Sequence, residues 1–362
     1  MSTNKPNTAT ENPISDEPLA NVGAIPLSPE EVLEKIDILE QVFIPHPEAK
    51  EVLEALEKLR RHRRPGSKLN RAARCLLLTG PSGTGKSTLL RRWENNFPLV
   101  ETPEGDRQPV LYVELPSRCT TKALAENMLR ALHLPEAMAS KGTEVALMER
   151  VKHHLRHQGV EVIILDEVQH LIESRGQNGV YRAADFVKSL LNAAICPVVL
   201  AGTPEATAIF EENEQLKRRA AGQHALKAFN WEVGEDRAVF RAILNAYEEQ
   251  LPLPEASNLG KDKTLAFRIH YFATGRIGRA IDFLHAATID ALETGATCLN
   301  MDVLHATAAV FPETQEFNRV NPFGNVDLSA LKAQPGPDEL PSRKTRLRKG
   351  KRKLKQSDLL AA

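Results

Sequence analysis

The chain has 362 residues, of which 42% are hydrophobic and 26% are charged, a balance typical of a water-soluble globular protein with two or three domains. Its 47 basic and 47 acidic side chains cancel, so the net charge by itself favours neither a nucleic acid nor a membrane as a partner. The 4 cysteines lie far apart without metal-ligand spacing, and no apolar run approaches the roughly 20 residues that cross a bilayer, so we expect a cytoplasmic protein without a membrane helix.

The first 66 residues carry a polar stretch and then two helix patterns. Residues 1–27 are rich in Pro, Asn, Thr and Ser, so we expect a disordered extension there. Ser28 and Glu31 have the spacing of a capping box around a proline, which predicts the start of a helix. We assign residues 28–66 to a helical prefix. Its arginine-rich end, residues 60–64, either contacts DNA or an acidic partner, or is a solvated helix end.

An apolar run from Cys75 to Leu78 predicts a buried strand, and a glycine-rich turn and a helix follow it. Residues 80–87 fit the phosphate-loop pattern G-x-x-x-x-G-K-[ST], in which the glycines let backbone N–H groups point at phosphate oxygens. Lys86 would place a charge at the β- and γ-phosphates of ATP, and the Ser87 hydroxyl would bind Mg²⁺. The predicted nucleotide ligands are Gly80, Pro81, Ser82, Gly83, Thr84, Gly85, Lys86, Ser87 and Thr88.

A second nucleotide pattern spans residues 160–167, where an apolar run leads into Asp166 and Glu167. The run is apolar on both faces, as expected of a parallel strand covered by helices. At the carboxyl end of that strand, Asp166 would hold Mg²⁺. Glu167 would orient or deprotonate the water that attacks the γ-phosphate. Apolar strands that end in acids are common, but this one follows the phosphate loop by roughly 80 residues and corroborates it.

A further strand pattern, residues 196–203, ends in Thr203. Its hydroxyl would sense the γ-phosphate or position the attacking water; the alternative is a turn residue before Pro204. Residues 205–219 then predict a charged helix that ends in three basic residues. We assign residues 67–232 to an α/β domain, because its strand patterns alternate with helix patterns.

Beyond Trp231 the sequence carries helix patterns only, so we assign residues 233–312 to a small all-helical domain. Residues 313–362 are expected to be a flexible linker and a basic tail. Between Arg343 and Lys355 the tail has nine lysines and arginines and no acid, a composition that binds polyanions or the acidic surface of a partner.

Taken in this order, the phosphate loop, the acidic strand end, the polar strand end, the arginine pair and the helical domain resemble an AAA+ ATPase. The resemblance implies an α/β P-loop NTPase with a parallel sheet flanked by helices, followed by an all-helical lid. It makes Thr203 a sensor and the arginine pair, with Arg219 favoured over Arg218, a finger that reaches a neighbouring subunit's γ-phosphate. The alternative for the pair is a basic helix terminus. In the lid, Arg276 or Arg279 would be a second sensor.

Four phrases narrow the resemblance to the TniB/TnsC-type transposition regulators, which are relatives of MuB, over about residues 30–312. They are DEVQHL (166–171), LAGTPEA (200–206), QLKRR (215–219) and GRIG (275–278). The resemblance implies that ATP drives homo-oligomeric rings or helical filaments on duplex DNA, associated with the bacterial nucleoid. Such an assembly would recruit a transposase, and hydrolysis would dismantle it. In some relatives a target-selecting partner, which can be an RNA-guided complex, loads the assembly.

The same resemblance implies sequence-independent contacts to DNA phosphates. The candidates lie between a further apolar strand pattern, residues 110–115, and the helix pattern that follows it: Arg118, Thr121 and Lys122. Solvated loop cations are the alternative. The basic tail would suit transposase docking or plain affinity for DNA.

Three other functions compete with this interpretation. The first is a secretion-type ATPase related to ExeA, although neither a membrane segment nor a peptidoglycan-binding module is visible. The second is a replication initiator or loader, although too few residues follow the lid for a winged-helix domain. The third is a switch that binds ATP and scarcely hydrolyses it, against which Asp166 and Glu167 argue.

Overall fold

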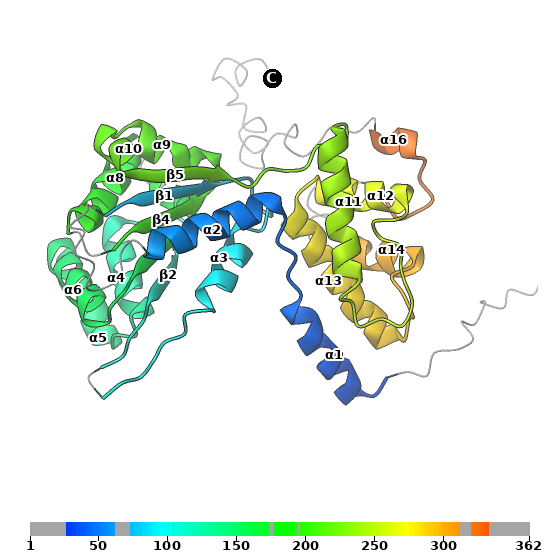
Figure 1. Cartoon of the computed structure of the whole chain (residues 1–362), viewed down its shortest axis with the longest axis horizontal. Coiled ribbons are helices and arrows are strands. Elements are labelled where there is room, and N and C mark those ends of the chain that lie inside the picture. Colours follow the sequence, from blue (N-terminus) through cyan, green and yellow to red (C-terminus); the bar gives the residue numbers. More distant parts are fainter. Residues whose placement is uncertain are drawn as a thin grey trace, which may run out of the picture.

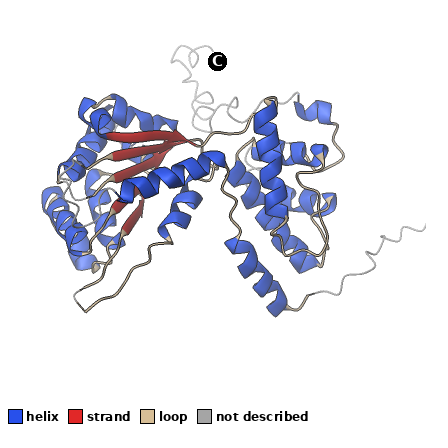
Figure 2. Cartoon of the chain, in the orientation of Figure 1, coloured by secondary structure: helices blue, strands red, loops and turns tan. Residues whose placement is uncertain are grey.

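The computed structural model describes residues 27–61, 73–103, 105–173, 177–193, 196–311 and 320–332. Figures 1 and 2 show an α/β part, in which helices surround a sheet, beside an all-helical part. Within the described residues, no helix has both the length and the apolarity that crossing a bilayer requires. Of the extension expected to be disordered, residues 1–27, all but residue 27 lie outside the described residues, as does the basic tail at 343–355.

A parallel five-stranded sheet in the order β2-β3-β4-β1-β5 forms the centre of the α/β part. Its strands are β1 (Cys75–Thr79), β2 (Val110–Glu114), β3 (Val162–Asp166), β4 (Val198–Gly202) and β5 (Ala220–Ala225). Strands β3 and β4 are buried along their whole length, because they lie inside the sheet and helices cover both of its faces. Strand β5 is an edge strand and is only partly buried.

Two hydrophobic cores hold helices against the two faces of this sheet. One face carries α2 (Pro47–Arg61) and α3 (Lys86–Glu94). The other face carries the remaining helices of this part. These are α4 (Thr121–Ala131), α5 (Glu136–Ala139), α6 (Glu144–His157), α7 (Gln169–Glu173), α8 (Gln177–Asn192), the short 3₁₀ helix η1 (Pro204–Thr207), α9 (Ala208–Glu211) and α10 (Glu214–Arg219).

The all-helical part has its own core, built from α11 (Gly234–Glu248), α12 (Lys263–Ala273), α13 (Ile277–Thr294) and α14 (Met301–Val310). Helix α1 (Pro29–Gln41) also packs on this core through Leu39 and lies against α13. The capping box predicted for α1 is confirmed: the Ser28 N–H donates to the Glu31 carboxylate at 2.8 Å, and the Glu31 N–H donates to the Ser28 hydroxyl at 3.3 Å. The structure therefore divides the helical prefix, with α1 on the helical part and α2 on the sheet.

Residues 320–332 differ from the flexible linker that the sequence led us to expect. Phe323 is buried in the core of the helical part, where its ring stacks on Phe283 at 5.2 Å between centroids. The Arg268 guanidinium donates to the carbonyl oxygens of Pro322 and Val326. Helix α16 (Leu328–Lys332) ends this segment. Burial of one aromatic ring, together with a cation that bonds to backbone carbonyls, holds the segment on the helical part.

Candidate nucleotide site

The phosphate loop turns sharply between β1 and α3. Gly83 and Gly85 have φ angles of 81° and 87°, in the left-handed region that favours glycine. The Thr84 hydroxyl donates to the Pro81 carbonyl at 2.9 Å and braces the turn. A Cβ atom at Gly80 would lie 2.2 Å from the Leu226 carbonyl oxygen. The three glycines thus keep side chains away from parts of the loop, which leads into the start of α3, where the helix dipole attracts anions.

Lys86 is held inside this loop and is only 4% exposed. Its Nζ atom donates to the carbonyl oxygens of Gly80 at 2.7 Å and Pro81 at 3.0 Å. Burial lowers the pKa of Lys86, whereas the charges of Glu167 and Asp166 raise it. A cation held on two loop carbonyls, with carboxylates nearby, is suited to receive an anion, so the residues present fit a bound triphosphate. Ser87 follows on the same helix, α3, as its second residue.

Asp166 is fully buried at the carboxyl end of β3. One carboxylate oxygen accepts the Glu167 N–H at 2.8 Å, and the other accepts the Tyr112 hydroxyl at 2.6 Å. The Arg91 guanidinium covers the Tyr112 ring at 3.8 Å from its centroid. Burial and the neighbouring Asp166 raise the pKa of Tyr112, so its hydroxyl keeps its proton and donates it. Tyr112 could not be predicted as a site residue, because nothing in a strand pattern shows which tyrosine contacts the aspartate.

The sheet brings the phosphate loop and Thr203 to the same edge. Thr79 pairs with Gly202 across β1 and β4, and the Gly80 N–H donates to the Gly202 carbonyl at 3.2 Å. Thr203 follows Gly202 directly, as the residue that precedes η1. Because the strands are parallel, the end of β3 with Asp166 and Glu167 lies at this edge as well. The structure thus brings together the loop, both acids and Thr203.

The start of α13 is docked on the phosphate loop. The Arg279 N–H donates to the Gly83 carbonyl at 2.9 Å, and the Arg276 guanidinium donates to the Ser82 carbonyl at 3.3 Å. The charge of Arg276 also lowers the pKa of Lys86, which places this guanidinium near the ammonium group. Both predicted lid arginines therefore lie at the loop, and Arg276 has its side chain on it. The helical part covers the candidate site as a lid.

We expect Gly278→Ala to weaken nucleotide binding by at least about tenfold, since small displacements at such sites have large effects. A Cβ atom at Gly278 would lie 2.7 Å from the Gly85 nitrogen and 2.8 Å from the Gly83 oxygen, so the lid would have to move. Helix propensity alone predicts that Gly278→Ala stabilises the helix by about 1 kcal/mol. The measurement is the dissociation constant of a fluorescent ATP analogue. Gly234→Ala is the control, because its Cβ would meet nothing closer than Arg237 at 3.9 Å; equal affinities in the two variants would contradict the docking.

A cavity of about 80 Å³ lies between the loop, α3 and the lid. Its lining is mainly apolar: Val42, Phe43, Ile44, Ala49, Leu89, Leu226, Ile277 and Ile281, with Thr88 among the polar residues. His46 and Tyr247 also line it, and the His46 Nδ1 atom and the Tyr247 hydroxyl have no hydrogen-bond partner within the described residues. Burial lowers the pKa of His46, which favours the neutral ring. An apolar cavity with a few polar groups is suited to a nucleobase, and no sequence pattern predicted it.

The arginine pair at the end of α10 lies away from the chain's own phosphate loop. Ala220, which follows Arg219, pairs with Cys75 at the beginning of β1, whereas the loop follows the other end of that strand. At about 3.3 Å per residue, strand β1 separates Ala220 from the start of the phosphate loop by roughly 13 Å. Arg218 is exposed, and Arg219 is half-buried with an Nη1 atom that has no partner within the described residues. Neither arginine is brought to the site of its own chain.

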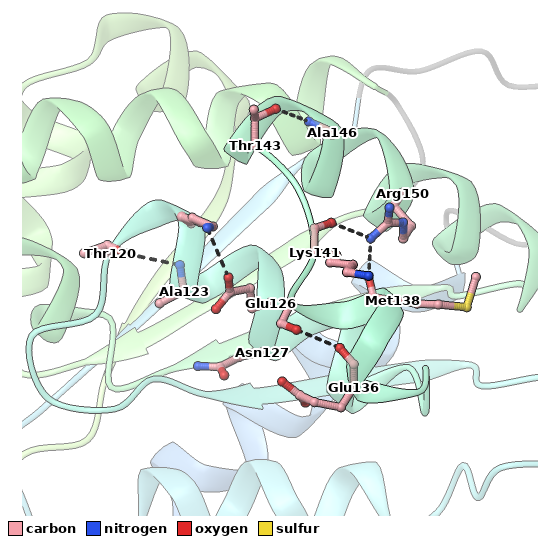
Figure 3. Close-up of polar contacts among 12 residues, drawn as sticks. Thr120, Ala123, Glu126, Asn127, Glu136, Met138, Lys141, Thr143, Ala146 and Arg150 are labelled. Atoms are coloured by element: carbon pink, nitrogen blue, oxygen red, sulfur yellow. Dashed lines mark hydrogen bonds and ion pairs between the residues drawn. The ribbon is translucent and has the colours of Figure 1, made fainter.

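The predicted DNA contacts surround the start of α4. Arg118 and Lys122 are exposed, and Lys122 lies 3.7 Å from Glu126. Figure 3 shows this region, with Thr120 accepting the Ala123 N–H at 3.1 Å as the cap of α4. Thr121, the first residue of α4, is only 9% exposed and lines a small surface pocket together with Arg182 of α8. Thr121 therefore offers a phosphate much less surface than Arg118 and Lys122 do.

A family model described as the bacterial TniB protein matches residues 35–231, which is more than half of the chain. Among curated proteins, none matches the chain.

Solved structures resemble the chain in fold. The ORC2 protein of Aeropyrum pernix, in ADPNP–ADP complexes, has 16% identity and a TM-score of 0.51, over 78% of this chain and 74% of that chain. The Aeropyrum pernix ORC1 protein in complex with DNA has 19% identity and a TM-score of 0.50, over 76% and 68%. Cdc6p from Pyrobaculum aerophilum has 15% identity and a TM-score of 0.50, over 83% and 74%. The predicted P-loop sheet with a helical lid is thereby confirmed.

Proposed function

The chain belongs to the TniB family and is an AAA+ ATPase, and on this basis we propose that it is an ATP-dependent regulator of DNA transposition. It assembles on duplex DNA in its ATP-bound form, presents that DNA to a transposase, and comes apart when ATP is hydrolysed. The family supports the role in transposition. The observation that supports control of assembly by the nucleotide is the docking of α13 on the phosphate loop. Because of this docking, the position of the lid would depend on what the loop binds.

In this proposal ATP and Mg²⁺ are bound between the α/β part and the lid. Lys86 exchanges its two loop carbonyls for phosphate oxygens, and Arg276 reaches the γ-phosphate from the lid. Ser87 and Asp166 would hold Mg²⁺, which would neutralise negative charge on the phosphates. Glu167 acts as the general base on the attacking water, and Thr203 contacts the γ-phosphate or that water. The adenine ring of ATP enters the apolar cavity beside His46 and Tyr247.

We also propose that Arg219 completes the site of a neighbouring subunit. Its place at the opposite end of β1 from the loop supports action in trans, because the chain's own phosphates lie at the other edge of the sheet. A guanidinium supplied by a neighbour stabilises charge that develops during phosphoryl transfer. Hydrolysis then requires a ring or helical filament of this chain. A target-selecting protein, which can be an RNA-guided complex, would choose where that assembly forms.

The DNA contact in this proposal is made to phosphates by Arg118 and Lys122, which are exposed at the start of α4. Such contacts carry no sequence information and weaken with salt. The tail at residues 343–355 lies outside the described residues and keeps its proposed role in docking the transposase.

We expect the double variant Arg118→Ala/Lys122→Ala to bind duplex DNA more weakly and with a shallower salt dependence. Each lost phosphate contact lowers the slope of log affinity against log salt by about 0.9. The measurement is fluorescence anisotropy on two duplexes of unrelated sequence, with a slowly hydrolysed ATP analogue, over a series of salt concentrations. Arg130→Ala is the matched control, because this α4 arginine is paired with Glu136 at 2.7 Å. A double variant with the slope of the wild-type protein would show that the DNA contact lies elsewhere.

A further inference from the structure

A single buried amide joins the ends of β3 and β4. Gln169 is the first residue of α7 and is only 6% exposed. Its Nε2 atom donates to the Glu167 carboxylate, and its Oε1 atom accepts the Thr203 N–H at 3.1 Å. A carboxylate only accepts and a backbone N–H only donates, so these two partners fix which way the amide faces. The bridge spans the two residues that the proposed function assigns to the attacking water and the γ-phosphate.

The backbone on both sides is shaped to this amide. A Cβ atom at Gly202 would lie 2.5 Å from the Gln169 Oε1 atom, so only glycine lets the amide approach the end of β4. Glu167 has a φ of 57°, a left-handed conformation that is unfavourable for a residue other than glycine. The next residue, Val168, donates its N–H to the Ala201 carbonyl at 3.0 Å. The turn after β3 is thus held against β4 on both sides of the amide.

We propose that Gln169 is a positioning residue that ties the Glu167 carboxylate to the end of β4, so that Glu167 and Thr203 move together. One Glu167 oxygen is occupied by the amide, and the other remains for the attacking water. A shift of Thr203 caused by the γ-phosphate is passed through the amide to Glu167. This proposal rests on the roles that the proposed function gives to Glu167 and Thr203. A purely structural glutamine would fill the same space without affecting turnover.

Two substitutions distinguish the two hydrogen bonds that Gln169 makes, to Glu167 and to Thr203. Gln169→Met keeps the approximate volume and removes both hydrogen bonds. Gln169→Glu keeps an acceptor for the Thr203 N–H, but it replaces the donor to Glu167 by a second negative charge. Gln158→Met is the control: Gln158 is also buried and donates to the Leu132 carbonyl at 2.8 Å, far from this bridge in the fold. Comparison of these variants distinguishes loss of the tie from loss of any buried glutamine.

The first readout is amide hydrogen exchange across residues 199–207 in nucleotide-free protein, which does not depend on activity. We expect Gln169→Met to speed exchange at Thr203 by about tenfold or more, while Gln169→Glu and Gln158→Met leave it near the wild-type rate. The second readout is ATP hydrolysis. We expect kcat to fall by about tenfold to a hundredfold in both Gln169 variants, with KM changed less than about twofold.

Unchanged exchange at Thr203 in Gln169→Met, or an unchanged kcat in both Gln169 variants, would overturn the proposal, as would a change confined to KM. The Glu167→Gln variant distinguishes failure of the proposed role of Gln169 from failure of the proposed function. Rapid turnover in Glu167→Gln would remove the general base from the proposed function and leave the exchange result intact. Slow turnover in Glu167→Gln beside normal turnover in both Gln169 variants would leave Glu167 as the general base and reject the positioning role of Gln169.

Discussion

Lys86→Ala will lose ATP binding and, with it, assembly on DNA. In the wild-type chain the ammonium group is buried in the phosphate loop on the carbonyls of Gly80 and Pro81. Each hydrogen bond to a charged group contributes about 1.5–3 kcal/mol, so losing two such bonds to phosphate weakens binding by roughly a hundredfold or more. The fold will be retained, because the loop glycines and the Thr84 brace do not depend on Lys86.

The measurement for Lys86→Ala is isothermal titration with ATP and Mg²⁺, together with electron microscopy of the variant on duplex DNA. Lys152→Ala is the control, since Lys152 pairs with Glu149 at 2.8 Å on α6, on the face of the sheet opposite α3. An affinity within a few-fold of the wild-type value would remove Lys86 from the site. Normal assembly by a variant that does not bind ATP would reject nucleotide control.

Glu167→Gln will bind ATP and hydrolyse it slowly. The amide keeps the shape of the side chain but cannot take a proton from water, and the loss of a general base lowers rates by about 10²–10⁴-fold. The loop, Lys86 and the lid contacts are untouched, so affinity for ATP will change little. Assemblies on DNA will therefore persist longer than those of the wild-type chain, because their dismantling depends on hydrolysis.

Two measurements on Glu167→Gln check this expectation: phosphate release at saturating ATP, and the lifetime of the protein on DNA after dilution. Glu173→Gln, at the other end of α7, is the matched control and should hydrolyse ATP at the wild-type rate. Turnover in Glu167→Gln close to that of the control would assign the base to another group. Slow turnover together with short-lived assemblies would show that disassembly does not depend on hydrolysis.

The strands that the sequence predicts well are those whose own residues require burial. Apolar runs fix β1, β2, β3 and β4, because such runs are stable only under helices on both faces. Strand β5 (Ala220–Ala225) was missed, because AAGQHA has neither apolar alternation nor branched side chains, and its pairing with β1 makes it a strand. The single helix predicted at 205–219 is divided in the structure, where the Asn213 side chain caps the separate helix α10.

The phosphate loop and the acidic pair could be predicted because each is a local pattern with its own chemistry. The apolar cavity proposed for the adenine ring could not be predicted. Its lining residues, near 42–49, 226, 247 and 277–282, meet only after the lid folds back on the loop. Tyr112 and Gln169 lie close to predicted motifs, but their partners depend on strand order and side-chain direction. The low exposure of Thr121 could not be predicted for the same reason, because its polarity did not reveal how little of its surface is accessible.

Electron microscopy of the wild-type chain with duplex DNA, Mg²⁺ and a slowly hydrolysed ATP analogue tests the central claim most directly. We predict rings or helical filaments on the DNA that require the nucleotide, with a nucleotide lying between neighbouring subunits and Arg219 of one subunit directed at the phosphates of the next. A chain that remains monomeric on DNA with ATP and Mg²⁺ present would contradict the account.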